Sequence, residues 1–199
     1  MNRLLALWKL CRRARGHGRH RPPGSVAISY GSDTGFIIAI DGVWHIVIDG
    51  SDTVSEWLKN FAWWRIGNHR MAWGFSSVAR ELIPQIEAVI IQGSPVVLTG
   101  HSRGGAIAQA VARIMADRWH NISEIVTFGS PKVGGRRFRN DMTELGLIHT
   151  RVDAEGDPVT RLPWLRGRHY ETMHVLLKNN IRSGIRTHLS YGEMLRGVD

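Results

Sequence analysis

One short segment, Gly100-His101-Ser102-Arg103-Gly104, constrains the fold more than any other part of the sequence. An apolar run over 95–99 leads into it and an alanine-rich run over 106–119 leads out, which predicts a strand, a sharp turn and a helix. The glycines let the chain turn tightly beside a strained serine. A G-x-S-x-G pattern at such a junction exposes the serine hydroxyl at the carboxyl edge of a parallel sheet, so Ser102 is a candidate nucleophile.

Strands and helices alternate from about residue 43 onward. The predicted strands are 36–40, 43–48, 95–99, 124–128 and 148–153, and the predicted helices are 55–64, 78–90, 106–119 and 190–195. This order predicts an α/β fold with a mainly parallel central sheet and helices on both faces. Asp41-Gly42, between the first two strands, is a two-residue hairpin signal and adds an antiparallel edge.

Positive charge is concentrated at the start of the chain. The 199 residues carry 26 Lys and Arg against 17 Asp and Glu, and residues 1–22 hold seven of the basic side chains and no acidic one. Residues 23–199 are close to neutral, which argues against nucleic acid as a partner of the domain. We therefore divide the chain into a basic N-terminal arm, 1–22, and a single α/β domain, 23–199, with the boundary at Arg21-Pro22-Pro23-Gly24.

The arm has the pattern of a short amphipathic helix over about Met1 to Arg15, with Leu4, Leu5, Trp8 and Cys11 on one side. Two interpretations stay open: a solvated tail, or a helix that rests on an anionic membrane. The apolar run is too short for a signal peptide, and the chain has no 18-residue apolar stretch. These patterns predict a cytoplasmic or peripheral membrane location.

A serine hydroxyl needs an adjacent base, and the base needs an acid to orient it. In an α/β-hydrolase these residues follow the serine in the order acid, then histidine. Asp157 lies in a Gly/Pro loop after a predicted strand, and His188 lies near the C-terminal end of the sequence. The order of the residues thus predicts a Ser102–Asp157–His188 triad.

Four blocks in this order resemble the class 3 lipases, the α/β-hydrolases typified by fungal triacylglycerol lipases. They are Gly100 to Gly105 (GHSRGG), Thr127 to Gly134 (TFGSPKVG), Glu155 to Val159 (EGDPV) and His188 to Tyr191 (HLSY). The resemblance extends back to Ile48-Asp49-Gly50-Ser51, where the family usually has Phe-Arg-Gly-Thr. It covers about residues 35–192.

The resemblance implies a serine esterase that cleaves acylglycerol or phospholipid esters through an acyl-enzyme on Ser102, without a cofactor. It implies that Asp157 is the acid and His188 the base. It also implies an oxyanion hole formed by the backbone N–H groups of Ser51 and Arg103. The sequence departs from the family at Arg103, where leucine is common, and at Asp49, where arginine is frequent.

Several residues compete for these roles. His101, inside the turn, is usually structural in the family, and His169 and His174 also lie between Asp157 and His188. Asp153 and Glu155 are rivals of Asp157, although Asp153 falls inside a predicted strand and is better suited to a structural role. The sequence contains no His-Glu-x-x-His pattern, which would have indicated a catalytic metal.

Trp63 and Trp64 are adjacent, so a helix would point them about 100° apart. Either both pack in the interior, or one lines an acyl groove as a substrate-binding residue. A second function stays open as well: a non-catalytic relative that binds lipid or a partner through the arm and this aromatic segment.

Overall fold

The computed structural model of the protein describes residues 3–15, 20–31, 33–49, 71–118, 121–163, 167–178 and 184–197. Its elements in chain order are α1 (Arg3–Ala14), β1 (Val26–Tyr30), β2 (Asp33–Ile40), β3 (Val43–Ile48), α3 (Trp73–Glu87), β4 (Val96–His101), α4 (Arg103–Met115), β5 (Ile122–Phe128), α5 (Arg136–Glu144), β6 (His149–Ala154), the 3-10 turn η3 (Val159–Arg161), β7 (Met173–Leu177), α6 (Ile185–Leu189) and α7 (Tyr191–Arg196).

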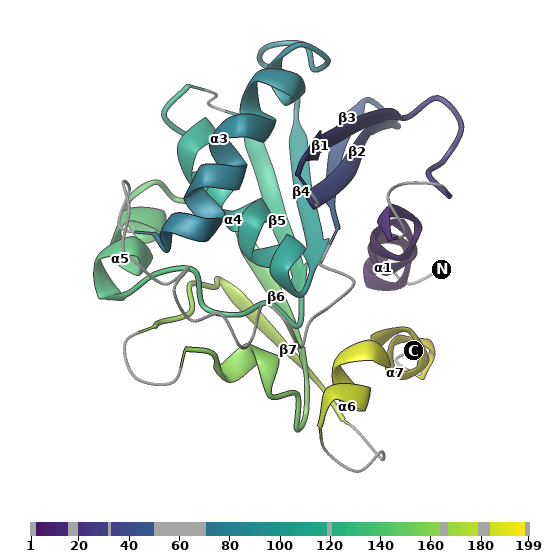
Figure 1. Ribbon diagram of the computed structural model, residues 1–199, viewed down its shortest axis with the longest axis vertical. Helices are drawn as coiled ribbons and strands as arrows, with labels where there is room; N and C mark the ends of the chain where they lie inside the picture. Colours follow the sequence, from purple (N-terminus) through teal and green to yellow (C-terminus); the bar gives the residue numbers. More distant parts are fainter. Residues whose placement is uncertain are drawn as a thin grey trace.

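The seven described strands form one sheet in the order β1-β2-β3-β4-β5-β6-β7 (Figure 1). The pairs from β3 to β7 are all parallel, whereas β1–β2 and β2–β3 are antiparallel. At the hairpin between β2 and β3, Asp41 and Gly42 both have positive φ angles, of 50° and 78°, as a two-residue turn with the right twist requires. The predicted α/β fold, the mainly parallel sheet and its antiparallel edge are confirmed.

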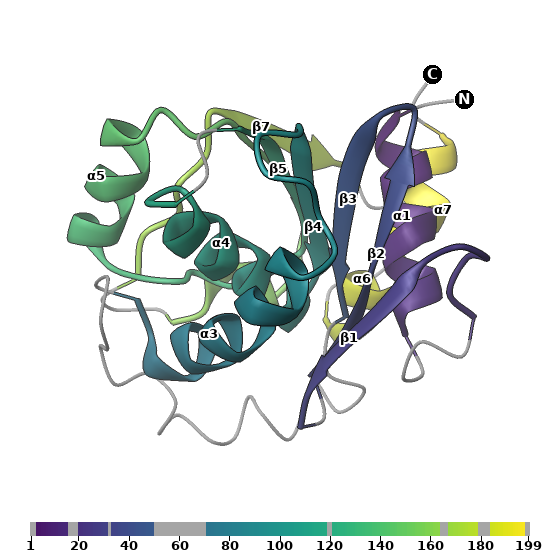
Figure 2. The same cartoon turned by 90° about the horizontal axis from the view of Figure 1, so that it is seen from above.

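Strand order decides which helices cover which face. Right-handed crossovers between parallel strands in sequential order all return over the same face of the sheet. Figure 2 shows α3, α4 and α5 together on that side. Their apolar side chains form a buried cluster with the sheet that includes Leu82, Ile107 and Phe138. The opposite face must therefore be covered by segments outside the crossovers.

Helix α1 and the C-terminal helices α6 and α7 cover that opposite face (Figure 2). Leu7, Trp8 and Cys11 of α1 are buried in a second apolar cluster with β-strand residues such as Phe36 and Val47. Arg3 forms an ion pair with Glu124 at the start of β5. The amphipathic helix is confirmed, but residues 3–14 are not a tail in solvent: their apolar side belongs to the core.

Five of the described elements were not predicted: β1, β7, α5, α6 and the 3-10 turn η3. Strand β1 and strand β7 are sheet edges with mostly exposed residues, and α5 buries only Phe138 and Met142. The predicted helix over 55–64 lies outside the described residues. Among the described helices, none is both long enough and apolar enough to cross a membrane.

Candidate active site

The turn between β4 and α4 holds Ser102 in a strained conformation. Its φ and ψ angles are 57° and −129°, a region that non-glycine residues rarely occupy and that costs on the order of 1–3 kcal/mol. The Ser102 N–H donates to the Phe128 carbonyl at the end of β5, at 2.9 Å. Since α4 begins at Arg103, the backbone N–H groups of its first turn lie immediately after the serine.

Two glycines make this turn sterically possible. A Cβ on Gly100 would lie 2.5 Å from the carbonyl group of Gly104, and a Cβ on Gly104 would lie 2.3 Å from the Ile48 carbonyl oxygen. Real Cβ atoms essentially never approach backbone this closely. Glycine at position 104 thus lets α4 start directly against the end of β3.

Asp157, in the loop after β6, is hydrogen-bonded to His188 of α6. His188 Nδ1 and Asp157 Oδ2 are 2.8 Å apart, and both side chains have no exposed surface. The Val159 N–H donates to the other carboxylate oxygen, Oδ1, at 2.9 Å. When His188 is neutral, a Nδ1–H donated to the carboxylate leaves Nε2 as the acceptor, which is the state a general base requires.

Tyr191 completes the surroundings of the carboxylate. Its hydroxyl donates to Asp157 Oδ2 at 2.8 Å and accepts the Ala154 N–H at 2.9 Å. Burial, followed by the charges of Asp157 and Asp153, raises the pKa of Tyr191 well above 10, so the hydroxyl keeps its proton. No role was predicted for this tyrosine, because its contact with Asp157 joins residues that are 34 positions apart in the chain.

His101 lies directly beside His188. Its Nε2 is 2.9 Å from the His188 carbonyl oxygen, and the two rings stack with centroids 4.4 Å apart. The Trp8 ring, from α1, meets the His101 ring edge-on at 5.0 Å. Burial, then the proximity of His188, with smaller effects of Arg15 and Arg12, lowers the pKa of His101 well below 6.5. His101 is therefore neutral and can donate its Nε2–H to the carbonyl oxygen.

The predicted pairing of Ser102 with His188 is not seen as a hydrogen bond among the described residues. Ser102 Oγ and His188 Nε2 are buried, and neither has a hydrogen-bond partner within the described part of the chain. Gly129, one residue beyond β5, lies next to the same group: a Cβ there would be 3.0 Å from His188 Cε1 and 2.8 Å from Asp157 Oδ2. Catalytic hydrogen bonds often tighten only when substrate is bound.

The rival residues lie in other surroundings. Asp153 forms an ion pair with Arg151 and a hydrogen bond with His174, whose Nε2 is 3.2 Å from the carboxylate. His169 Nε2 is 2.6 Å from the Thr160 carbonyl oxygen, and burial is the main cause that lowers its pKa to about 3. Glu155 is exposed at the turn before Asp157. None of these side chains is hydrogen-bonded to His188 or Asp157 in the residues the structure describes.

Three predicted site residues lie outside the part of the chain that the structure describes. Ser51, Trp63 and Trp64 all fall in the range 50–70, outside the described residues. The predicted oxyanion hole is therefore described only on the Arg103 side, at the first turn of α4.

Comparison with known proteins identifies the group to which this site belongs. The family model for lipase (class 3) matches residues 45–167, more than half of the chain. The chain belongs to the class 3 lipase family. The match includes Ser102 and Asp157 but ends before His188, so the position of His188 in the site depends on the contacts described above.

The chain matches its relatives over part of its own length and part of theirs. A secreted mono- and diacylglycerol lipase of Fusarium solani is 30% identical over 59% of the chain and 38% of its own length. The phospholipase A1 EG1 of rice (Oryza sativa subsp. indica) is 33% identical over 45% of the chain and 23% of its own length. The chain thus spans well under half the length of these relatives.

Solved structures share its fold. The lipase–propeptide complex of Rhizomucor miehei superposes with a TM-score of 0.72 at 18% identity, over 96% of this chain and 79% of that one. The Lip2 lipase of Yarrowia lipolytica gives a TM-score of 0.69 at 18% identity, over 92% and 81%. These likenesses establish that the chain has the α/β-hydrolase fold.

Proposed function

We propose that this class 3 lipase-family protein is a serine carboxylic-ester hydrolase, with Ser102 as nucleophile, His188 as base and Asp157 as acid. The observation that carries the proposal is the fully buried hydrogen bond between His188 Nδ1 and Asp157 Oδ2, behind an Nε2 that has no described partner. A strained serine on a strand-to-helix turn beside such a pair is the arrangement used for acyl transfer.

The reaction would run in two halves. His188 Nε2 takes the Ser102 proton while Oγ forms a bond to the ester carbonyl carbon, and the carbonyl oxygen becomes an oxyanion. The Arg103 N–H at the start of α4 would stabilise that oxyanion, together with the Ser51 N–H. His188 then gives its proton to the leaving alcohol as the ester C–O bond breaks. Water, deprotonated by His188, attacks the acyl-enzyme and releases the carboxylic acid and Ser102. No cofactor is needed for these steps.

Acylglycerols or phospholipids are the proposed substrates. The names of the relatives support both classes, since one is a mono- and diacylglycerol lipase and another a phospholipase A1. Trp63 or Trp64 would contact the acyl chain. A panel from short p-nitrophenyl esters to acylglycerol emulsions and phospholipid vesicles would decide between them.

Peripheral contact with an anionic membrane through residues 1–22 belongs to the same proposal. Lys9, Arg12 and Arg13 of α1 are exposed, whereas the apolar side of the helix is buried. The contact would therefore be mainly electrostatic and weaken with salt. Such contact fits a cytoplasmic or peripheral membrane protein, and nucleic acid is not expected as a partner.

The test replaces the nucleophile. Ser102→Ala should abolish p-nitrophenyl ester hydrolysis and labelling by a fluorophosphonate, while Ser29→Ala, at an exposed position of β1, should retain both. Labelling of the Ser102→Ala protein would remove Ser102 from the proposed role. Absence of turnover on every ester, combined with lipid binding, would favour the non-catalytic relative.

A further inference from the structure

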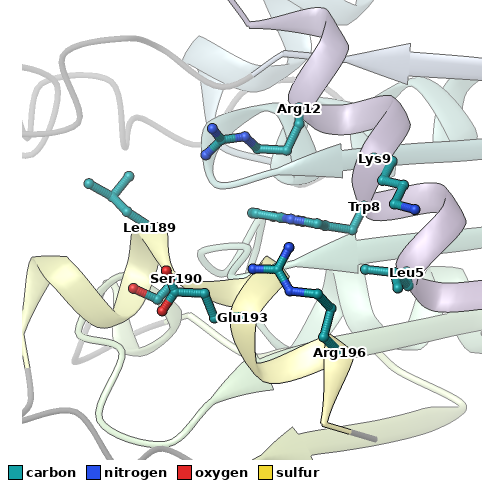
Figure 3. Close-up of a pocket in the computed structure, with 9 residues that line it drawn as sticks. Leu5, Trp8, Lys9, Arg12, Leu189, Ser190, Glu193 and Arg196 are labelled. Carbon is teal, nitrogen blue, oxygen red and sulfur yellow. The ribbon is translucent and has the colours of Figure 1, made fainter. Parts of the chain in front are cut away.

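A cavity of about 250 Å³ lies between α1 and α7. Figure 3 shows the residues that line it, and Figure 2 shows that both helices lie on the sheet face opposite α3 to α5. Its lining residues come from two segments that are distant in sequence: the middle of α1, and the chain from the end of α6 into α7. This cavity is separate from the turn at Ser102, whose residues do not line it. The proposed mechanism gives it no role.

The charge around the cavity is predominantly positive. Among the described residues, Lys9, Arg12 and Arg196 line it, against one carboxylate, that of Glu193. Figure 3 shows Arg12 of α1 and Arg196 of α7 on either side of the Trp8 ring. Neither arginine forms an ion pair with any residue that the structure describes. Two guanidinium groups on two helices, without a carboxylate partner in the described part of the chain, favour an anionic ligand.

The lining also has an apolar part, formed by Leu5, Trp8 and Leu189 beside Ser190 and Gly192. Trp8 is buried, whereas Leu5 is partly exposed and Leu189 is 40% exposed. A small inorganic anion would leave the exposed parts of Leu5 and Leu189 in contact with water. An anion that carries an alkyl chain would cover them and meet the arginines at the same time. The lining therefore matches an amphiphile with an anionic head.

We propose that the cavity between α1 and α7 binds the anionic head and first methylene groups of an amphiphile, and that this ligand is a free fatty acid. Arg12 and Arg196 would hold the carboxylate, and Leu5, Trp8 and Leu189 would contact the chain. The assignment of a fatty acid rests on the proposed function, because ester hydrolysis of lipids releases this compound. The same chemistry is present in the head group of an anionic lipid in a bilayer.

The position of the cavity connects a bound ligand to the proposed triad. Leu189 and Ser190, in its wall, directly follow His188, and Gly192 directly follows Tyr191. Trp8 contacts His101, which in turn stacks on His188. A bound fatty acid would therefore contact the chain segments that hold the proposed base.

The test measures binding in the Ser102→Ala protein, so that turnover plays no part and a failed esterase assignment does not affect the result. Decanoate, below its critical micelle concentration, is titrated by calorimetry and by the Trp8 indole N–H signal in NMR, with decanol as the uncharged match. Arg12→Gln/Arg196→Gln should weaken decanoate binding by on the order of tenfold or more, because two charge-assisted contacts are lost. The control, Arg13→Gln/Arg186→Gln, removes the same charge from exposed positions outside the cavity and should bind like the parent.

Phosphatidylglycerol and phosphatidylcholine vesicles distinguish the two sources of the ligand. Decanoate binding that depends on the cavity arginines supports the free fatty acid. If only phosphatidylglycerol vesicles show this dependence, the cavity binds an anionic amphiphile but the fatty-acid assignment is overturned. Equal weakening in both double variants, decanol binding as tight as decanoate binding, or no binding of either probe overturns the site itself. Melting curves of each variant establish that it is folded.

Discussion

His101 and His188 form a stacked pair in which the first histidine also bonds the backbone of the second. Their ring centroids are 4.4 Å apart, and the 2.9 Å contact from His101 Nε2 reaches the His188 carbonyl oxygen. The residue before the proposed nucleophile thus fixes both the ring plane and the main chain of the proposed base. His101 is a positioning residue in this arrangement, because it acts through His188.

Replacing His101 should separate these two effects. His101→Phe keeps a ring for stacking but removes the hydrogen bond, so we expect kcat on a p-nitrophenyl ester to fall about tenfold with little change in KM. His101→Ala also leaves a cavity and should cost an additional ~2 kcal/mol or more of unfolding free energy. Kinetics and chemical denaturation of both variants measure these quantities. Full activity in both would show that His188 needs no support from residue 101.

Tyr191→Phe removes one hydrogen bond to Asp157 and the acceptor for the Ala154 N–H. Because the Ala154 N–H is then left buried without this acceptor, we expect a loss of about 1–3 kcal/mol in unfolding free energy. We also expect kcat to decrease about tenfold, because the Asp157 carboxylate loses one of the donors that hold it in place. Tyr30→Phe, at an exposed position of β1, is the control and should match the wild type in both measurements.

The packing of α4 against β3 should not tolerate a side chain at Gly104. Gly104→Ala would place a Cβ 2.3 Å from the Ile48 carbonyl oxygen, and neither the strand nor the helix start can move easily. We expect a loss of more than about 3 kcal/mol, or no soluble folded protein. The matched substitution Gly197→Ala meets nothing closer than 3.7 Å and should leave the melting temperature almost unchanged. A Gly104→Ala protein of normal stability would contradict the described turn.

Stability should decline as the pH falls below about 6.5. Burial is the main cause that lowers the pKa of His149 to about 3, and burial also lowers that of His101 well below 6.5. Between pH 6.5 and 3 the unfolded chain binds a proton at residue 149 that the folded chain does not, and His101 acts in the same direction below pH 6.5, so unfolding becomes more favourable as acid is added. Each such group contributes up to about 1.4 kcal/mol per pH unit in this window.

His149→Gln tests this assignment. Glutamine keeps a polar group near Thr127 but cannot take up a proton in this range. Although the variant starts from a lower stability at pH 7, its unfolding free energy should depend less steeply on pH between 6.5 and 4 than that of the wild type. An unchanged slope in urea titrations at several pH values would contradict the buried neutral state of His149.

Trp8 offers a test of whether α1 supports the site. Trp8→Leu removes the ring that contacts His101, and we expect kcat to fall severalfold in addition to a stability loss of a few kcal/mol. Leu7→Ala removes another buried side chain of α1 and serves as the control for stability alone. At a temperature where both variants are folded, only Trp8→Leu should show reduced kcat.

The parts of the fold that follow from local patterns were accessible from the sequence. The strand–turn–helix around Ser102 and the hairpin at Asp41-Gly42 have short-range signals, so they could be predicted from residue type and spacing. The order of the acid and the histidine indicated Asp157 and His188, which the structure brings into contact. Their assigned roles stay predictions until the variants are measured.

Other features depend on tertiary context and could not be predicted. The burial of Trp8 follows from a sheet face that sequential crossovers leave uncovered, which no local pattern of α1 encodes. Tyr191 was quoted as part of a motif, but its bond to Asp157 requires that α7 begin beside the end of β6. Strand β7 is an edge strand with little apolar alternation, and so gave too weak a signal.

The packing of α1 against the sheet has a practical consequence for the design of shortened or fused versions of this chain. Deletion of residues 1–22 would remove the Trp8 indole, which contacts His101, and would expose Phe36 and Val47 to water. A truncated product that aggregates or loses turnover would then say nothing about membrane attachment. Charge-reversing substitutions on the exposed side of α1 test membrane attachment and leave the sheet face covered.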